Sequence, residues 1–393
     1  MRKRIYMDYA STTPLDPRVL RAMLPHLTKK YGNPSSLYEE GVEAKNALDE
    51  ARTAVAHSLQ AHTDEIVFTS GGTEANNLAL LGVVRAREKR GTALSAIHCI
   101  TTVIEHSSLL ECFREFEARG VKVDYVPVDE NGIVDPQNIS QRLRPETVLV
   151  SVGYVNNEIG TVQPIREIAK IIRAYNTQLS RDTTTRILFH TDACQAPVYF
   201  DCLAERLGID LMTLDGHKMY GPKGVGCLYL RRGTPLEPQL YGGGQERGYR
   251  STTENVYAVV GFAEALRVAE ERREKESERL QTLRDLTFSE IEKKVPQAVL
   301  NGDRKKRTPN NINISLPGVD TEFAVLKLDV AGIACSTKSS CLGTDGASYV
   351  VRALGGDERR AVSTLRFSFG GSTTKKDVGV LVREVCRLVQ GSE

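Results

Sequence analysis

Seven short apolar runs alternate with longer amphipathic segments between residues 64 and 230. The runs are continuous rather than alternating, which is typical of strands buried on both faces. We expect strands at 65–69, 97–104, 121–128, 148–155, 187–193, 211–215 and 226–230. Helical patterns such as those at 73–89 and 165–176 lie between them. This alternation predicts a mainly parallel seven-stranded sheet with helices on both faces.

The pattern changes near residue 257. Residues 257–295 form one long helical stretch, rich in Ala, Leu, Glu and Arg, and its charge-dense middle (EERREKESER) is typical of a solvated helix face. Shorter α and β pieces follow, among them NINISL and STLRFSF. We therefore expect an α/β protein with a large domain over 16–260 and a smaller α+β domain made of 1–15 and 261–393.

Composition narrows the classes of partner. The 393 residues carry 52 basic and 50 acidic side chains and a net charge of +2, which gives no electrostatic reason to expect nucleic acid or a membrane. No apolar run approaches the roughly 20 residues of a membrane span, and the N-terminal segment lacks the apolar run of a signal peptide. The eight cysteines form no CxxC pair. We expect no metal site and no disulfide framework, but small core residues of a cytoplasmic protein.

A lysine and an aspartate follow two of the predicted strands. Lys218 lies in the glycine-rich turn DGHKMYGPKG, where open α/β sheets bind ligands and a buried lysine can form a Schiff base. Asp192 ends another strand, and the ring nitrogen of pyridoxal phosphate (PLP) requires such a carboxylate because the protonated ring is an electron sink. Alone, each could be a surface lysine or a helix cap. Together they indicate a PLP site.

Two glycine-rich segments are candidates for binding phosphate. Residues 65–81 predict a strand, a turn at Gly71 and Gly72, and a helix capped by Thr73, whose positive end can bind an anion. This segment lacks the GKS of a P-loop and the spacing of GxGxxG. Residues 241–255 (YGGGQERGYRSTTEN) add two arginines as donors. The alternatives are a plain helix cap and a flexible surface loop.

With these pieces in place, the chain resembles the cysteine desulfurases of the NifS and IscS kind, within the class V aminotransferase family. The likeness runs from Tyr6 almost to the C-terminus and follows nine segments in order. These are MDYASTTP, YGNPSS, EIVFTSGGTEANN, VNNEIGTVQPI, DACQ, GHKMYGPKG, GGGQERGYRS, SYVVRALG and LRFSFGG. The resemblance implies the PLP-dependent transferase fold type I, PLP as the cofactor and L-cysteine as the substrate.

The resemblance also implies roles for individual residues. Lys218 would bond to the cofactor aldehyde, Asp192 would pair with the ring nitrogen, and His106 would stack on the ring and move protons. Arg366, helped by Asn33, would hold the substrate carboxylate. The other cofactor contacts would come from Gly72, Thr73, Asn156, Gln195, His217 and, from a neighbouring subunit, Thr253. Sites shared in this way imply a homodimer.

The expected sulfur acceptor lies in residues 333–355, which resemble the family's mobile cysteine loop. We expect Cys341 to be the catalytic cysteine, because Ser, Thr, Gly and Asp around it supply flexibility and Lys338 favours the thiolate. The competitor, Cys335, ends an apolar strand pattern and is expected to be buried. The implied reaction leaves alanine and a persulfide on Cys341. A sulfur-acceptor protein would collect this sulfur for iron–sulfur cluster assembly or tRNA thiolation.

Some positions depart from the family's pattern. Asp215 stands where the family usually has a serine that donates to the cofactor phosphate. Its carboxylate could point away, pair with a cation such as Arg250, or be protonated, and weakened PLP affinity follows as a hypothesis. Gln245 replaces a histidine, and the cysteine loop is shorter and lacks a proline. Two alternatives remain open: a selenocysteine lyase or aminotransferase, and a non-catalytic binding protein with the same fold.

Overall fold

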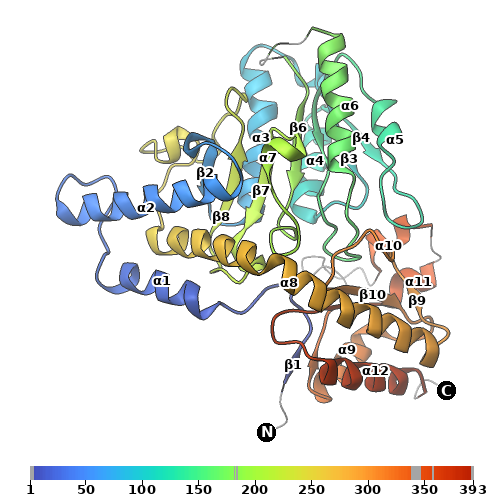
Figure 1. Cartoon of the computed structure of the whole chain (residues 1–393). Coiled ribbons are helices and arrows are strands. Elements are labelled where there is room, and N and C mark those ends of the chain that lie inside the picture. Colours follow the sequence, from blue (N-terminus) through green and yellow to red (C-terminus); the bar gives the residue numbers. More distant parts are fainter. Residues whose placement is uncertain (1–3, 181, 183–184, 338–346, 356–357, 391–393) are drawn as a thin grey trace.

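The central element is one seven-stranded sheet (Figure 1). The computed structural model describes residues 4–180, 182, 185–337, 347–355 and 358–390. The strands of the sheet are β2 (Ile66–Thr69), β3 (His98–Thr102), β4 (Lys122–Val126), β5 (Thr147–Ser151), β6 (Leu188–Asp192), β7 (Leu211–Asp215) and β8 (Gly226–Leu230). Their order is β2-β8-β7-β6-β5-β3-β4, and every neighbouring pair is parallel except the two that involve β8. The seven predicted strands and the mainly parallel sheet are confirmed.

Helices cover both faces of this sheet. They are α1 (Pro17–Thr28), α2 (Glu39–Ser58), α3 (Gly72–Lys89), α4 (Ser107–Ala118), α5 (Pro136–Ser140), α6 (Ile165–Gln178) and α7 (Ala204–Leu207), with 3₁₀ turns η1 (Thr63–Glu65), η2 (Leu94–Ala96), η3 (Gly216–Lys218) and η4 (Glu246–Gly248). Successive strand residues face opposite sides. Leu188 therefore belongs to the core under α3 and α4, whereas Phe189 belongs to the core under α2 and α6. Burial on both faces explains why the strands are continuously apolar.

The long helix α8 (Val256–Lys294) joins two layers of the molecule (Figure 1). Its first half, up to Ala269, packs in the core of the large sheet. Its second half, from Leu280, packs in a separate core around the C-terminal elements. The charge-rich middle of the helix is exposed or half-buried along its length, as its sequence predicts. The change of core therefore lies between Ala269 and Leu280, while the division into domains at residue 260 stays a prediction.

A smaller layer contains both ends of the described chain. Its antiparallel sheet has the order β12-β10-β9, and β1 pairs in parallel with β11. The strands are β1 (Ile5–Tyr6), β9 (Val299–Leu300), β10 (Asn311–Ser315), β11 (Ile333–Ala334) and β12 (Thr364–Ser368), and the helices are α9 (Thr321–Val330), α10 (Tyr349–Ala353), α11 (Glu358–Val362) and α12 (Lys375–Gln390). This arrangement of helices beside two small sheets is the expected α+β architecture.

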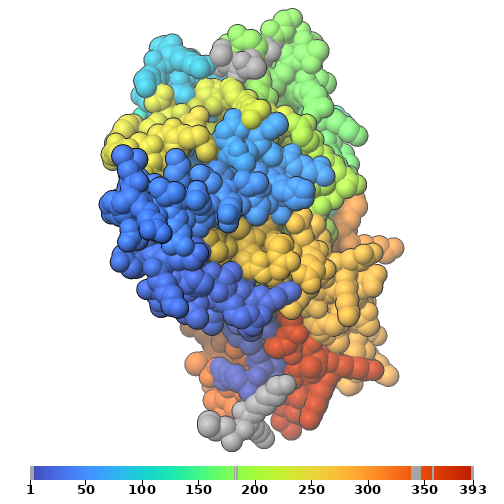
Figure 2. Space-filling model, turned by 60° about the vertical axis from the view of Figure 1, so that its left-hand side comes forward, coloured from blue at the N-terminus to red at the C-terminus, as the bar shows by residue number. Residues whose placement is uncertain are grey.

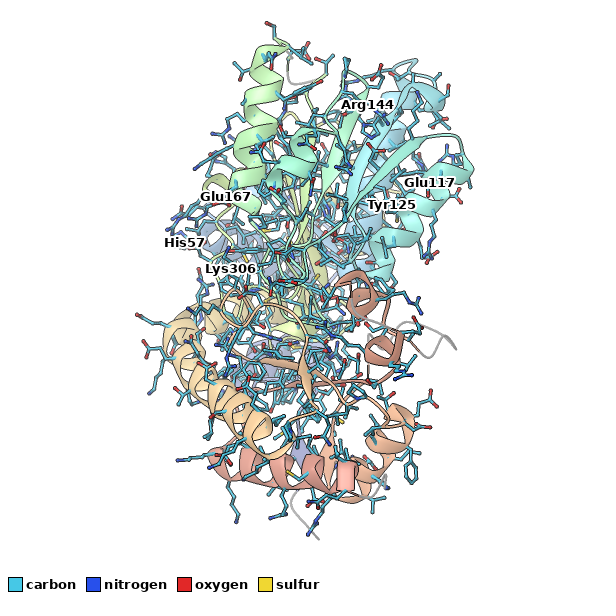
Figure 3. The ribbon with its side chains drawn as sticks, turned by 90° about the vertical axis from the view of Figure 1, so that its right-hand side faces the viewer. His57, Glu117, Tyr125, Arg144, Glu167 and Lys306 are labelled. Carbon is cyan, nitrogen blue, oxygen red and sulfur yellow. The ribbon has the colours of Figure 1, made fainter. Side chains whose placement is uncertain are left out.

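The two layers meet along the segment after β9. Figure 3 shows Lys306 at the level where they join, with Tyr125 and Glu117 at the outer edge of the large sheet. The carbonyl of Lys306 accepts a hydrogen bond from the N–H of Val162 at 3.0 Å. The buried Arg307 donates to the carbonyl of Ile159 at 2.6 Å. These contacts fix the small layer against the loop after β5. In the described part of the chain, no helix combines the length and apolar character needed to cross a membrane.

Candidate active site

A cavity of about 200 Å³ opens at the carboxyl ends of the parallel strands. Ligands of open α/β sheets bind at this edge. The cavity is lined by the ends of β6 and β7, the start of α3, the loop after β5, the N-terminal segment and one side chain of β12. Of the residues singled out from the sequence, those that line it are Gly72, Thr73, His106, Asn156, Asp192, Gln195, Asp215, His217, Lys218 and Arg366.

Lys218 ends the 3₁₀ turn η3, directly after β7. Its Nζ donates to the carbonyl oxygens of Ala10 at 2.8 Å and Ser11 at 2.7 Å. Gly221 makes the tight return of this loop possible, because a Cβ there would lie 2.7 Å from the carbonyl oxygen of Gly216. The loop therefore fixes the amine on the cavity wall, against the N-terminal segment.

A chain of hydrogen bonds links Asp192 to His106. Asn76 donates through Nδ2 to Asp192 Oδ2 at 2.7 Å and to Ser108 Oγ at 2.9 Å. The same hydroxyl lies 2.8 Å from His106 Nδ1. Burial lowers the pKa of His106, so the ring is mainly neutral near pH 7. A carboxylate and a neutral imidazole are thus held in fixed relative positions across the cavity.

The start of α3 lies at the cavity, where the sequence predicts a phosphate cradle, and one detail of that prediction needs correction. The helix begins at Gly72 and its N-cap is Gly71, so the prediction that Thr73 caps it is wrong. Asp215 performs this task instead: its Oδ2 accepts from the N–H of Gly72 at 2.7 Å. A Cβ at Gly72 would lie 2.8 Å from Cys194 Sγ, so the close approach of these elements requires glycine.

The structure excludes an orientation of Asp215 away from the cavity, and it excludes Arg250 as the partner of the carboxylate. The carboxylate faces the cavity wall rather than pointing away, because it bonds to Gly72 and also accepts from the N–H of His217 at 3.2 Å. Arg250 is not its partner. The guanidinium of Arg250 is paired with Glu74, at 2.8 Å from Nε to Oε1. The Asp215 carboxylate therefore occupies the N–H group at the start of α3.

Arg366 projects from β12 and is 1% exposed. Its Nη2 donates to Asp8 Oδ1 at 2.9 Å and Ser11 Oγ at 2.7 Å, and its Nη1 donates to the carbonyl of Asn157 at 2.9 Å. Its Nε is buried and has no hydrogen-bond partner within the described residues. A guanidinium fixed in this way can bind a carboxylate entering the cavity.

Three further predicted residues occupy the cavity wall through defined contacts. Asn156 donates to the carbonyl of Ile104 at 2.8 Å. Gln195 donates to the carbonyl of Ala10 at 2.9 Å. His217 Nδ1 lies 3.1 Å from the hydroxyl of Thr12, and burial lowers the pKa of the imidazole.

Two predicted residues do not line the cavity. Asn33 is exposed, and its side chain accepts from the N–H of Ser35 at 2.9 Å. Thr253 is also exposed, close to the start of α8. Their assignments to substrate and to a neighbouring subunit's cofactor stay predictions. Cys341 and Lys338 lie outside the described residues.

The cysteines of the described chain are free thiols. Burial raises the pKa of Cys335 to about 12, and it has the same effect on Cys112, Cys202 and Cys227. Cys194 lines the cavity, and burial, with the charges of Asp192 and Asp215, also raises its pKa. These thiols stay protonated near neutral pH and are poor nucleophiles.

Some residues of the site were not found from the sequence. Asn76, Glu105 and Cys194 line the cavity, and Asp8 holds Arg366. Asn76 stands one turn after Gly72, so its side chain points back toward the helix start, which is a usable signal. Glu105 directly precedes His106 but carries no spacing signal of its own.

Known proteins are similar to this chain in sequence and in fold. A family model described as aminotransferase class-V matches residues 5–381. The chain belongs to the aminotransferase class-V family. A relative named cysteine desulfurase IscS, from Dictyoglomus turgidum, is 41% identical over 391 residues, which cover 99% of this chain and 95% of the relative.

Solved structures of relatives agree with the fold. One described as a NifS-like protein superposes with a TM-score of 0.90 at 33% identity, covering 99% of this chain and 100% of that one. Another, described as SspA in complex with cysteine, superposes with a TM-score of 0.78 at 32% identity, covering 93% and 99%. The expected fold type I architecture is confirmed.

The cofactor of this class-V enzyme is PLP, and the cavity fits it with one exception. Lys218 supplies an amine, Asp192 a carboxylate, and the buried Asn76 Oδ1 has no hydrogen-bond partner within the described residues. Gly71 and Gly72 place no side chain of their own over the start of α3, a helix end that favours an anion. The exception is Asp215, a second anion at that same helix end.

Proposed function

We propose that this chain, a PLP-dependent cysteine desulfurase, passes sulfur from L-cysteine first to the thiol of Cys341 and then to an acceptor protein. One observation carries the proposal: Lys218, Asp192 and Arg366 come from three separate parts of the chain and line one cavity. An amine, a ring-nitrogen partner and a carboxylate receptor are the three groups that PLP chemistry on an amino acid requires.

Most of the residues that would hold PLP line the cavity. Asp192 would bind the ring nitrogen and keep it protonated, and the bond from Asn76 would orient that carboxylate. His106 would lie against the ring, with Asn156 and Gln195 at its edge. The start of α3, with Gly72, Thr73 and His217, would receive the phosphate, joined by Thr253 of a second copy. When bound, PLP supplies an aldehyde carbon for the amino group of cysteine and a protonated ring that withdraws electrons from Cα.

The protein's own residues would then act on the substrate. Arg366, with Asn33, would bind the substrate carboxylate and set the position of Cα. Lys218 would take the proton from Cα of the bound cysteine. The Cys341 thiolate would attack the substrate sulfur, and the bond between Cβ and that sulfur would break. Cα and Cβ regain protons, so one L-cysteine and one enzyme thiol give one L-alanine and one persulfide.

The assignment of sulfur transfer to Cys341 is supported by the other cysteines. Cys335, its competitor, is buried enough to raise its pKa to about 12. Cys194 is in the cavity, but its pKa is raised by burial and by two carboxylates. An attacking thiol must be present as the thiolate.

A homodimer is supported by the surface of the N-terminal helices. Figure 2 shows this segment, in blue, exposed beside the yellow segment that follows β8. Apolar side chains gather there: Leu37 is 96% exposed and Tyr241 is 76% exposed. Others in the same region are Leu20, Leu24, Leu27, Tyr31 and Tyr38. Several exposed apolar side chains on one surface favour a protein partner. If that partner is a second copy of the chain, its Thr253 would reach the cofactor phosphate of this copy.

The wider role proposed for the enzyme is cytoplasmic sulfur supply. A persulfide on Cys341 would feed iron–sulfur cluster assembly or tRNA thiolation through an acceptor protein. The relatives named IscS support this role.

One experiment tests the proposal. The purified protein is loaded with PLP, and its visible absorbance is recorded before and after addition of L-cysteine while alanine is measured. We expect a visible absorbance band that changes when L-cysteine is added, and one alanine released for each L-cysteine consumed. The peptide that contains Cys341 should gain the mass of one sulfur atom. A Lys218→Ala variant should lose the lysine-linked band. Release of alanine without any mass change on Cys341 would contradict the proposed transfer.

A further inference from the structure

Asp215 occupies the hydrogen-bond donors at the phosphate end of the cavity. It ends β7 and is 8% exposed. Its Oδ2 accepts from the N–H of Gly72 at 2.7 Å, and its Oδ1 accepts from the N–H of His217 at 3.2 Å. The Gly72 N–H is the first of α3, a helix of 18 residues whose N-cap offers no side chain. An anion is favoured at such a helix end, and here the protein supplies one itself.

We propose that Asp215 is an internal competitor for the phosphate of PLP, so that this enzyme holds its cofactor through Lys218 and Asp192 more than through the phosphate. This inference rests on the proposed function. The inference goes beyond that function because it makes Asp215 the residue that controls the affinity for the cofactor.

Charge and hydrogen bonding both support competition. An ionised carboxylate accepts hydrogen bonds but donates none, so it cannot bind a phosphate through a hydrogen bond. It also occupies two N–H donors, those of Gly72 and His217, that could otherwise bind the phosphate. Like charges at close range disfavour each other, most strongly in a poorly hydrated cavity.

The cations of the same region do not remove this charge. His217 Nε2 lies 3.5 Å from Asp215 Oδ2, but burial lowers the pKa of the imidazole and favours its neutral form. Arg250 is bound by Glu74 through two contacts, at 2.8 Å and 3.1 Å. A phosphate entering the cradle must therefore displace the carboxylate from Gly72 or take up a position beside it.

The contact between Asp215 and Gly72 also affects the stability of the protein, and this effect distinguishes a competitor of the phosphate from a purely structural residue. In the protein without PLP, the carboxylate caps α3, and loss of a helix cap is destabilising. Replacement of Asp215 should therefore lower the melting temperature of the PLP-free protein and raise its affinity for PLP. Replacement of a residue with a purely structural role would lower both the melting temperature and the affinity for PLP.

The experiment compares the wild type with Asp215→Ser and Asp215→Asn, using full-length protein freed of PLP. Asp320→Asn is the matched control, because Asp320 also caps a helix, accepting from the N–H of Phe323 at 2.9 Å, but does not line the cavity. The melting temperature of each PLP-free protein is measured, and each protein is then titrated with PLP and with pyridoxal, which lacks the phosphate. Binding is followed by visible absorbance, and the link to Lys218 is confirmed by borohydride reduction and peptide mass.

We expect Asp215→Ser to bind PLP at least tenfold more tightly and to bind pyridoxal within about twofold of the wild type. Asp215→Asn should show a smaller gain, because it removes the charge but keeps an acceptor near Gly72. Inorganic phosphate should compete with PLP more strongly in both variants than in the wild type. Asp320→Asn should change neither affinity.

The outcomes separate this inference from the proposed function. If the wild type forms no PLP link to Lys218, the proposed function fails. If that link forms but neither Asp215 variant changes the ratio of PLP to pyridoxal affinity, only the competitor role is overturned. Should Asp215→Ser not fold, Asp215→Asn decides the question by the same ratio.

Discussion

Arg366 and Asp8 form an ion pair of 2.9 Å between Nη2 and Oδ1 at the cavity wall. The backbone of Arg366 also bonds to Ser336, with its N–H 2.7 Å from the Ser336 carbonyl and its carbonyl 3.2 Å from the Ser336 N–H. Ser336 stands shortly before residues 338–346, the segment that contains Cys341. Arg366, the proposed receptor for the substrate carboxylate, therefore also holds Ser336, which stands just before the segment that contains Cys341.

Arg366→Lys should weaken the binding of cysteine more than the binding of PLP. A lysine cannot keep the contacts to Asp8 and Asn157 and also present a planar fork to the substrate. We expect KM for L-cysteine to rise about tenfold or more, which corresponds to about 1.4 kcal/mol, with the visible PLP band unchanged. Alanine release measured against cysteine concentration gives KM. Arg387→Lys, in an exposed pair with Glu384 on α12, is the control and should leave KM unaltered.

Cys341→Ser and Cys335→Ser should differ sharply. Loss of Cys341 removes the attacking thiol, so persulfide and alanine formation should fall at least a hundredfold while PLP stays bound. Cys335→Ser should keep activity within about threefold of the wild type, because that thiol is buried with a raised pKa. Mass spectrometry of the cysteine-treated protein locates the extra sulfur. Native rates of alanine and sulfide release by Cys341→Ser would show that another residue accepts the sulfur.

The sequence was sufficient to predict the parts of the fold and site that depend on local pattern. The strands were identifiable because Leu188 and Phe189 are adjacent yet buried on opposite faces, which forces a continuous apolar run. Lys218 and Asp192 could be paired because parallel strands bring their carboxyl ends to one edge.

Contacts between distant residues could not be predicted in the same way. The bond between Asp215 and Gly72 joins residues 143 positions apart, and that between Asn76 and Asp192 joins residues 116 apart. Nothing near Asp215 in the sequence distinguishes a carboxylate on the helix end from one pointing away. The orientation depends on how β7 packs against the start of α3, which is a property of the whole sheet.

Asn76→Ala should impair the cofactor site, whereas Asn77→Ala should not. Asn76 donates to Asp192 and to Ser108, so its loss removes a donor from the carboxylate and breaks the link to His106. We expect the turnover number to fall at least tenfold, with a shift in the pH titration of the visible PLP band. Asn77 is the next residue of α3; its side chain donates to the carbonyl of Thr73 at 2.9 Å and does not line the cavity. An unchanged band in Asn76→Ala would show that Asp192 does not depend on this contact.

The stability of the protein should depend on Glu105 between about pH 5 and pH 7.5. Burial, with a smaller contribution from the charge of Asp192, raises the pKa of Glu105 from 4.5 to about 7. The folded protein therefore binds this proton more tightly than the unfolded chain does. The resulting stability is complete below pH 4.5 and is lost as pH rises through 7. The shift corresponds to a loss of about 3 kcal/mol at most.

Glu105→Gln isolates this effect. The amide can keep the acceptor for the N–H of Gly153 and donate to the hydroxyl of Thr102, so the local contacts survive without a titrating group. The melting temperature of the wild type, measured relative to that of Glu105→Gln, should fall as pH rises from 5 to 7.5. Comparison of the two proteins cancels the contribution of all other groups. If the two melting-temperature profiles run parallel over this range, Glu105 is already ionised at the lower pH, and the buried carboxylate beside His106 carries a negative charge in the working enzyme.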